Sequence, residues 1–114
     1  GQPLGMAIGH TVLEVLLRDN LPQHAAEQGA SIQEHLRRLS KTYPISDVRG
    51  KGLLIGCNVP DQCGPKLVEC CRDAGLLCNA PDHHMIRFVP PLIIEKSHVE
   101  AWARCFEKAL SVCF

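Results

Sequence analysis

Four short β-type runs, arranged in two pairs, constrain the fold of this chain more than any other feature. The first pair covers 45–49 and 53–59, with a glycine-rich stretch between them, and the second covers 76–79 and 85–89 around a polar turn. Short runs rich in Val, Ile, Leu and Phe and bounded by Gly, Pro, Asn or Asp are typical of strands. The two pairs therefore predict a small, mostly antiparallel sheet.

Apolar residues at helical spacing surround these runs and predict helices. Gly75 follows the third helical pattern where a glycine C-cap is expected. Ser97, with Glu100 three residues later, is expected to cap the last helix. A small sheet backed by helices on one face satisfies this order, so the predicted fold class is α+β. The helical patterns cover about 3–18, 22–41, 67–74 and 95–113.

Size and charge limit the function classes. The chain has 114 residues, which suffice for one core, and 46% of them are hydrophobic. Twelve basic residues balance twelve acidic ones, so no field attracts nucleic acid or an anionic membrane. No apolar stretch approaches the roughly 18 residues that a membrane span needs. We therefore expect neither nucleic acid nor membrane as a partner.

The cysteines indicate a reducing compartment. There are seven, an odd number, and Cys70 and Cys71 are adjacent, which disfavours an ordinary bridge between them. Reduced, mostly buried thiols of a cytoplasmic protein fit this usage. Cys78 with His83 and His84 could be read as metal ligands, but a zinc site usually needs four ligands, so two exposed histidines in a turn are favoured and no metal is expected.

Arg87 is the main candidate for a binding residue. It lies within "IRFVPPLII" and shares a strand face with Met85 and Val89, whereas Ile86 and Phe88 share the other face. A guanidinium keeps its charge when covered, and its planar fork suits a bidentate carboxylate or phosphate. A structural Asp or Glu, or water at a sheet edge, is the alternative partner. "VRGKGLLIG" lacks the spacing of a phosphate loop and reads as a sheet bend.

Several segments resemble, in order and spacing, the C-terminal part of class III pyridoxal-phosphate-dependent aminotransferases, and look most like acetylornithine aminotransferases. These segments are "GQPLGMAIGHTVLEVL", "ISDVRGKGLLIG", "GLLCNA" and "MIRFVPPLII", and the likeness covers essentially the whole chain. The most specific parts are "VRGKGL" and "IRFVPPL". Because the chain opens with Gly1 directly into a helical pattern, we expect it to be a piece of a longer protein.

The resemblance implies a domain organisation and a site. Residues 1–19 would be the linking helix from a large cofactor domain that precedes this chain, and residues 20–114 the small C-terminal domain. Arg87 would hold the α-carboxylate of the amino-acid or 2-oxo-acid substrate, with N-acetylornithine or a related ω-amino acid and 2-oxoglutarate as substrates. The longer enzyme would carry pyridoxal 5'-phosphate and form a homodimer.

No catalytic or cofactor-binding residue is expected within the chain itself. None of its five lysines stands in the sequence context of the family's cofactor lysine, so the chain resembles a substrate-clamping domain and should be inactive alone. The rival hypothesis is a free-standing α+β module that uses Arg87 for an anionic ligand, or that binds a protein partner, without catalysis.

Overall fold

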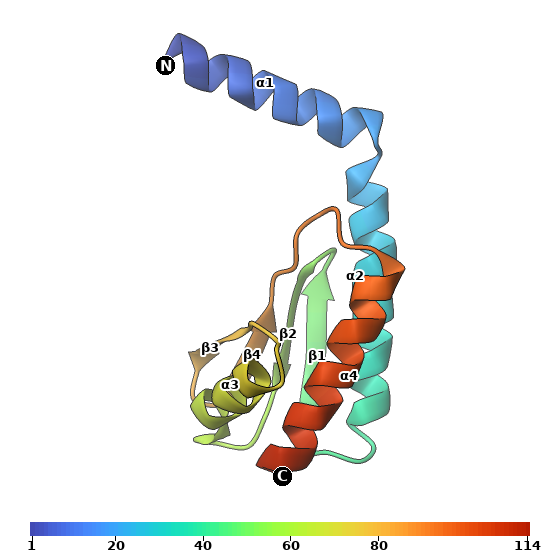
Figure 1. Ribbon diagram of the computed structural model, residues 1–114, viewed down its shortest axis with the longest axis vertical. Coiled ribbons are helices and arrows are strands. Elements are labelled where there is room, and N and C mark those ends of the chain that lie inside the picture. The colour runs from blue at the N-terminus through green and yellow to red at the C-terminus, as the bar shows by residue number, and fades with distance from the viewer.

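The computed structural model describes all residues 1–114 and confirms the α+β class (Figure 1). Four strands form one antiparallel sheet in the order β1-β2-β4-β3. None of the four helices combines the length and the apolar character of a membrane span. In chain order the elements are α1 (Pro3–Arg18), α2 (Leu21–Leu39), β1 (Ser46–Lys51), β2 (Leu54–Asn58), α3 (Cys63–Asp73), β3 (Asn79–Asp82), β4 (Met85–Phe88) and α4 (Lys96–Cys113).

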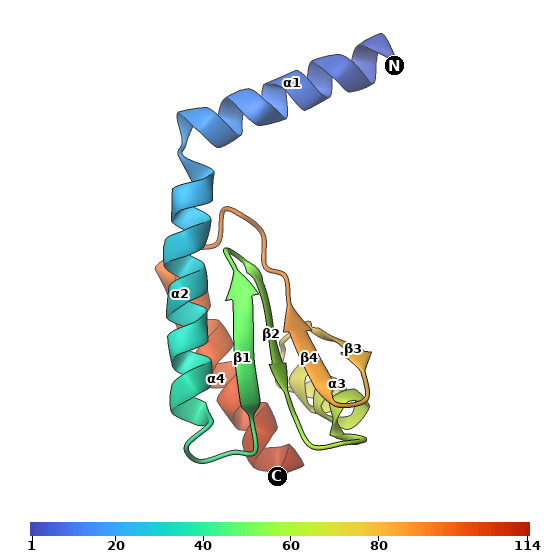
Figure 2. The same cartoon turned by 180° about the vertical axis from the view of Figure 1, so that it is seen from behind.

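One face of the sheet is covered by α2, α3 and α4, and the other is open. Figure 2 shows the strands in front of α3 and α4, seen from the open side. Ile55 and Cys57 of β2 and Ile86 and Phe88 of β4 are buried beneath the helices. Phe88 meets the rings of Trp102 and Phe106 edge-on, at centroid distances of 5.2 and 5.0 Å. The residues between these positions must therefore face outward.

Helix α1 stands apart from this body and contacts only α2 (Figure 1). Val15 and Leu16 near its end are half-buried, but most of its apolar side chains are exposed: Leu4 is 73% exposed and Leu17 is 78% exposed. Helix α2 behaves differently, because the stripe predicted for it is buried against the sheet and α4. The buried members of that stripe are Ala25, Gly29, Ile32, Leu36 and Leu39.

Two glycine predictions are confirmed. Between β1 and β2 the chain turns at Gly52, whose φ is +57°. Gly75, with φ +88°, follows α3 and donates its N–H to the Arg72 carbonyl, while the Leu76 N–H reaches the Cys71 carbonyl. This pair of bonds is the Schellman arrangement that glycine favours after a helix.

Two details of the sequence analysis are wrong. The strand predicted at 76–79 begins only at Asn79, because the backbone N–H of Leu76 is used by the cap of α3. Ser97 does not cap α4: the cap position is occupied by Glu95, two residues earlier, and the helix begins at Lys96. The backbone N–H of Glu95 donates to Nδ1 of His98 at 3.0 Å, so His98 makes the side-chain contact to the cap residue that was expected of Glu100.

Candidate functional site

A single row of residues crosses the open face of the sheet and contains the predicted site. Arg49 of β1 pairs with Gly56 of β2, Gly56 pairs with Arg87 of β4, and Arg87 pairs with Asn79 of β3. Ile55, Cys57, Ile86 and Phe88 point to the helices, so Gly56 and Arg87 belong to the opposite face. The sequence analysis identified Arg87 but not the other three residues.

Arg87 has one protein partner and no carboxylate. Its Nε donates to Oδ1 of Asn79 at 3.2 Å, and its side chain is exposed. The ion pairs of the chain lie elsewhere: His10 with Glu14, Arg18 with Asp19, Arg49 with Asp47, and His84 with Asp82. The structural Asp or Glu considered as an alternative partner of Arg87 is therefore not present in this chain, and neither terminal nitrogen has a protein acceptor.

Arg49 lies on the same face but, unlike Arg87, has a carboxylate partner within the protein. Its Nη1 donates to the carboxylate of Asp47 at 2.6 Å and to Oδ1 of Asn58 at 3.0 Å, and Nη2 contacts the sulfur of Met85 at 3.6 Å. These contacts hold the irregular part of β1, where the pairing register shifts and Asp47 adopts a φ of +48°. Arg49 thus has a local structural role, and its charge is already paired with Asp47.

An apolar groove lies where β4 ends. It has a volume of about 570 Å³ between the start of α2, the β1–β2 turn and the segment that follows Arg87, with Ala26, Leu54, Val89 and Leu92 among its lining residues. The continuation of that segment is fastened to α2, because Nε2 of His24 hydrogen-bonds the Ile94 carbonyl at 2.5 Å. The strand that carries Arg87 is therefore anchored on both sides of the groove.

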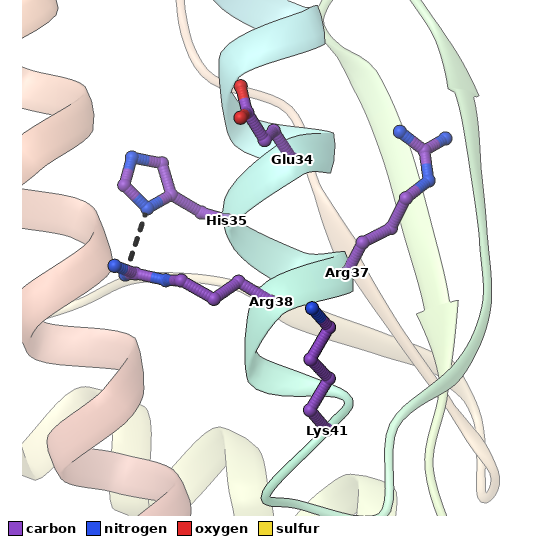
Figure 3. Close-up of a pocket in the computed structure, with 5 residues that line it drawn as sticks. All are labelled: Glu34, His35, Arg37, Arg38 and Lys41. Carbon is purple, nitrogen blue, oxygen red and sulfur yellow. Dashed lines mark hydrogen bonds between the residues drawn. The ribbon is translucent and has the colours of Figure 1, made fainter.

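The basic side chains on α2 form a separate surface, shown in Figure 3. His35 and Arg38 point to the same side and are joined by a hydrogen bond of 3.2 Å, whereas Arg37 points away from them and donates to Gln33 at 2.9 Å. The side chains that line this hollow belong to α2, except Lys41, which lies in the turn directly after it. With no second element to close it, we read this surface as the solvated face of α2.

The thiols and histidines singled out in the sequence lie apart from each other. Cys78 shares a hydrogen bond with Cys71 under the sheet, which lowers the pKa of Cys78, while His84 lies 3.5 Å from Asp82 in the β3–β4 turn. All seven cysteines are free thiols. Burial raises the pKa of Cys57 to about 12, although the charge of Arg49 opposes this shift.

Comparison with known proteins gives a consistent result. The family model for aminotransferase class-III matches residues 1–110. A [LysW]-aminoadipate semialdehyde transaminase of Deinococcus radiodurans is 34% identical over 111 residues, and an acetylornithine aminotransferase of Caldanaerobacter subterraneus is 32% identical over 112. Each match includes 97% of this chain but only 26% and 28% of the relative, so the chain spans about a quarter of the length of these proteins.

Solved structures of transaminases also match nearly the whole of this chain with less than a third of their own length. An (S)-enantioselective omega-transaminase from Thermomicrobium roseum superimposes with a TM-score of 0.90 and 28% identity, covering 100% of this chain and 28% of that one. Acetylornithine aminotransferase from Elizabethkingia anophelis gives a TM-score of 0.88, also at 28% identity, covering 96% of this chain and 30% of that one.

Proposed function

The chain belongs to the class-III aminotransferase family, as part of a larger transaminase, and from this membership we propose that it is the domain that binds the substrate carboxylate. The observation that carries the proposal is Arg87. Its guanidinium stands on the open face of a rigid sheet, and no carboxylate of the chain neutralises it. A charged fork fixed in this way is suited to holding a carboxylate in one orientation.

The proposed reaction moves an amino group between N-acetylornithine, or a related ω-amino acid, and 2-oxoglutarate. The names of the relatives support this choice, because several are acetylornithine or ornithine aminotransferases. In 2-oxoglutarate a carboxylate adjoins the reacting carbonyl carbon, whereas N-acetylornithine reacts at its terminal amino carbon, at the other end of the chain from its carboxylate. In our proposal Arg87 holds a carboxylate in both half-reactions, and the distance from that carboxylate to the reacting carbon differs between the two substrates.

Pyridoxal phosphate would supply the electron sink for this reaction, as it does in the family. The residues of this chain do not fit the cofactor. All five lysines are exposed, whereas a lysine that binds the aldehyde needs a covered position beside groups that hold the ring and the phosphate. In our proposal those groups belong to the large domain, and Arg87 contributes only the carboxylate contact.

Helix α1 is proposed to be the link to that large domain, with residues 1–19 forming the link and residues 20–114 the small domain. Its exposed apolar side chains support this assignment, because an apolar helix that buries none of its residues gains stability by packing against another surface. We also propose that the full-length enzyme is a cytoplasmic homodimer, as expected from the sequence.

The test is Arg87→Lys in the full-length aminotransferase. Lysine keeps the charge but loses the fork, and a hydrogen bond to a charged group contributes about 1.5 to 3 kcal/mol. The KM for both the amino donor and 2-oxoglutarate should therefore rise about tenfold or more, since about 1.4 kcal/mol corresponds to a factor of ten. The melting temperature and the cofactor absorbance should remain the same.

Arg49→Lys is the matched control. This arginine lies on the same face, but its partners belong to the protein, so its replacement should lower the melting temperature and leave both KM values unchanged. The proposal is wrong if Arg87→Lys leaves both half-reactions intact and lowers the melting temperature instead.

A further inference from the structure

We infer that Asn79 and Gly56, the two cross-strand neighbours of Arg87, are positioning residues that present its two terminal nitrogens to the substrate carboxylate. This inference rests on the proposed function of Arg87 and adds two determinants of the same site. Both residues are placed by the pairing register of the sheet, in which Arg87 is opposite Gly56 on one side and Asn79 on the other.

Asn79 determines which edge of the guanidinium is free. Nε of Arg87 donates to Oδ1 of Asn79 at 3.2 Å. Because arginine has no acceptor, the amide must turn its oxygen to Nε, which leaves the NH2 group of Asn79 as a further donor beside the fork. The side edge of the guanidinium, formed by Nε and one terminal nitrogen, is thus partly used. A carboxylate is left with the end edge, formed by the two terminal nitrogens.

Gly56 leaves the other side of Arg87 open, and the fold of this chain gives no reason for a glycine there. The φ of Gly56 is not positive, so its backbone does not require a glycine. An added Cβ would contact only the Ile86 carbonyl oxygen, at the ordinary distance of 3.4 Å. Gly29 is different, because a Cβ there would overlap the backbone of Gly52. A glycine inside a strand without such a reason often marks the close approach of a ligand.

The charges around this space favour an anion. Arg87 and the amide NH2 of Asn79 offer donors, and the nearest arginine across Gly56, Arg49, is already paired with Asp47. The site therefore carries one uncompensated positive charge. It should take one carboxylate of a dicarboxylic substrate, with the space above Gly56 left for the rest of the molecule.

Variants at Asn79 in the full-length enzyme test the first half of the inference, with 2-oxoglutarate as the probe. Asn79→Ala frees the guanidinium to rotate and should raise the KM for 2-oxoglutarate about fivefold, the effect of one lost hydrogen bond. Asn79→Asp still accepts from Nε but places a negative charge beside the substrate carboxylate, so the KM should rise at least about tenfold. A purely structural hydrogen bond would survive the change to Asp.

A double-variant cycle shows whether Asn79 acts through Arg87. In an Arg87→Ala background, Asn79→Ala should have no further effect on the KM. Asn58→Ala is the control, because it removes an asparagine from the same face that accepts from Arg49 instead. It should leave the KM unchanged. Equal effects of Asn58→Ala and Asn79→Ala, or additive effects with Arg87→Ala, would overturn the role of Asn79.

Gly56→Val tests the second half. Valine suits a strand, so the melting temperature should stay the same or rise, while the side chain fills the space beside Arg87 and raises the KM for 2-oxoglutarate about tenfold or more. An unchanged KM, or a lower melting temperature, would overturn the role of Gly56. If Arg87→Ala itself left the KM unchanged, the proposed function would fail; if it raised the KM and the Asn79 and Gly56 variants did not, only this inference would fail.

Discussion

Gly29→Ala should destabilise the domain strongly, because α2 touches the β1–β2 turn through this glycine. An added Cβ would lie 1.8 Å from the carbonyl oxygen and 2.7 Å from the carbonyl carbon of Gly52. Since ordinary contact begins near 3.4 Å, the helix and the turn must separate by about 1.6 Å, the difference between 3.4 and 1.8 Å. Both neighbouring atoms belong to backbone, so no side chain can move aside.

The expected cost is about 3 kcal/mol, at the upper end of what overpacking costs. Alanine should recover about 1 kcal/mol of helix propensity, so the overlap itself must cost more than the net loss. At an unfolding entropy of about 2.1 cal/mol/K per residue, a net loss of 3 kcal/mol lowers the melting temperature of a chain of this size by about 12 °C. Urea unfolding followed by circular dichroism, together with a thermal scan, measures both quantities.

Gly9→Ala is the control for this experiment. Gly9 lies in α1, and nothing is within 4 Å of the position that its Cβ would take. Alanine there should therefore be neutral or stabilise the helix by up to about 1 kcal/mol. If Gly29→Ala were as stable as Gly9→Ala, the close approach of α2 to the turn would not exist in solution, and the placement of the first hairpin would be wrong.

Two further predictions concern the core and the end of α3. Burial raises the pKa of Cys57 to about 12 from an ordinary value of 9.0, so the folded state holds this proton more tightly than the unfolded state, and the resulting stability is present below pH 9 and lost as the pH rises toward 12. Between pH 7.5 and 10.5 the free energy of unfolding, measured by urea titration, should therefore fall by about 2 kcal/mol more in the wild type than in Cys57→Ala. Equal losses would contradict the raised pKa of Cys57. Gly75→Ala should cost about 1 kcal/mol of stability, because φ is +88° at this position although the space around it is open. Gly75→Asn should cost less, since asparagine tolerates this conformation better. The same urea titration measures both variants, and an Asn variant less stable than the Ala variant would contradict this prediction.

The sequence predicted structural features correctly where they depend on the residues of a single helix or strand. The spacing of apolar residues along α2 predicts its buried stripe, and alternation in "MIRF" predicts that Arg87 leaves the core while Ile86 and Phe88 enter it. The misplaced strand before Asn79 shows the limit. The run 76–79 is apolar enough for a strand, but the cap of α3 takes its first N–H, and pairing with β4 begins only at Asn79.

The neighbours of Arg87 could not be predicted in the same way, because they depend on register between segments far apart in the chain. Arg49 is 38 positions before Arg87 and Asn79 is eight positions before it, yet both lie in one row across the sheet. Neither the turn length nor the bulge near Asp47 is fixed by alternation alone. A shift of one residue in either hairpin would turn the neighbour's side chain to the other face.

The two arginines of the row show why residue type alone does not determine function. Arg49 and Arg87 stand on the same face of the same sheet, but Asp47 and Asn58 supply acceptors to Arg49, whereas Arg87 has a single amide oxygen. The first arginine stabilises an irregular strand, and the second keeps both terminal nitrogens without a protein acceptor on an exposed face. Because the sheet gives one arginine a carboxylate partner and leaves the other without one, beside a glycine, we propose the anion site at Arg87 and not at Arg49.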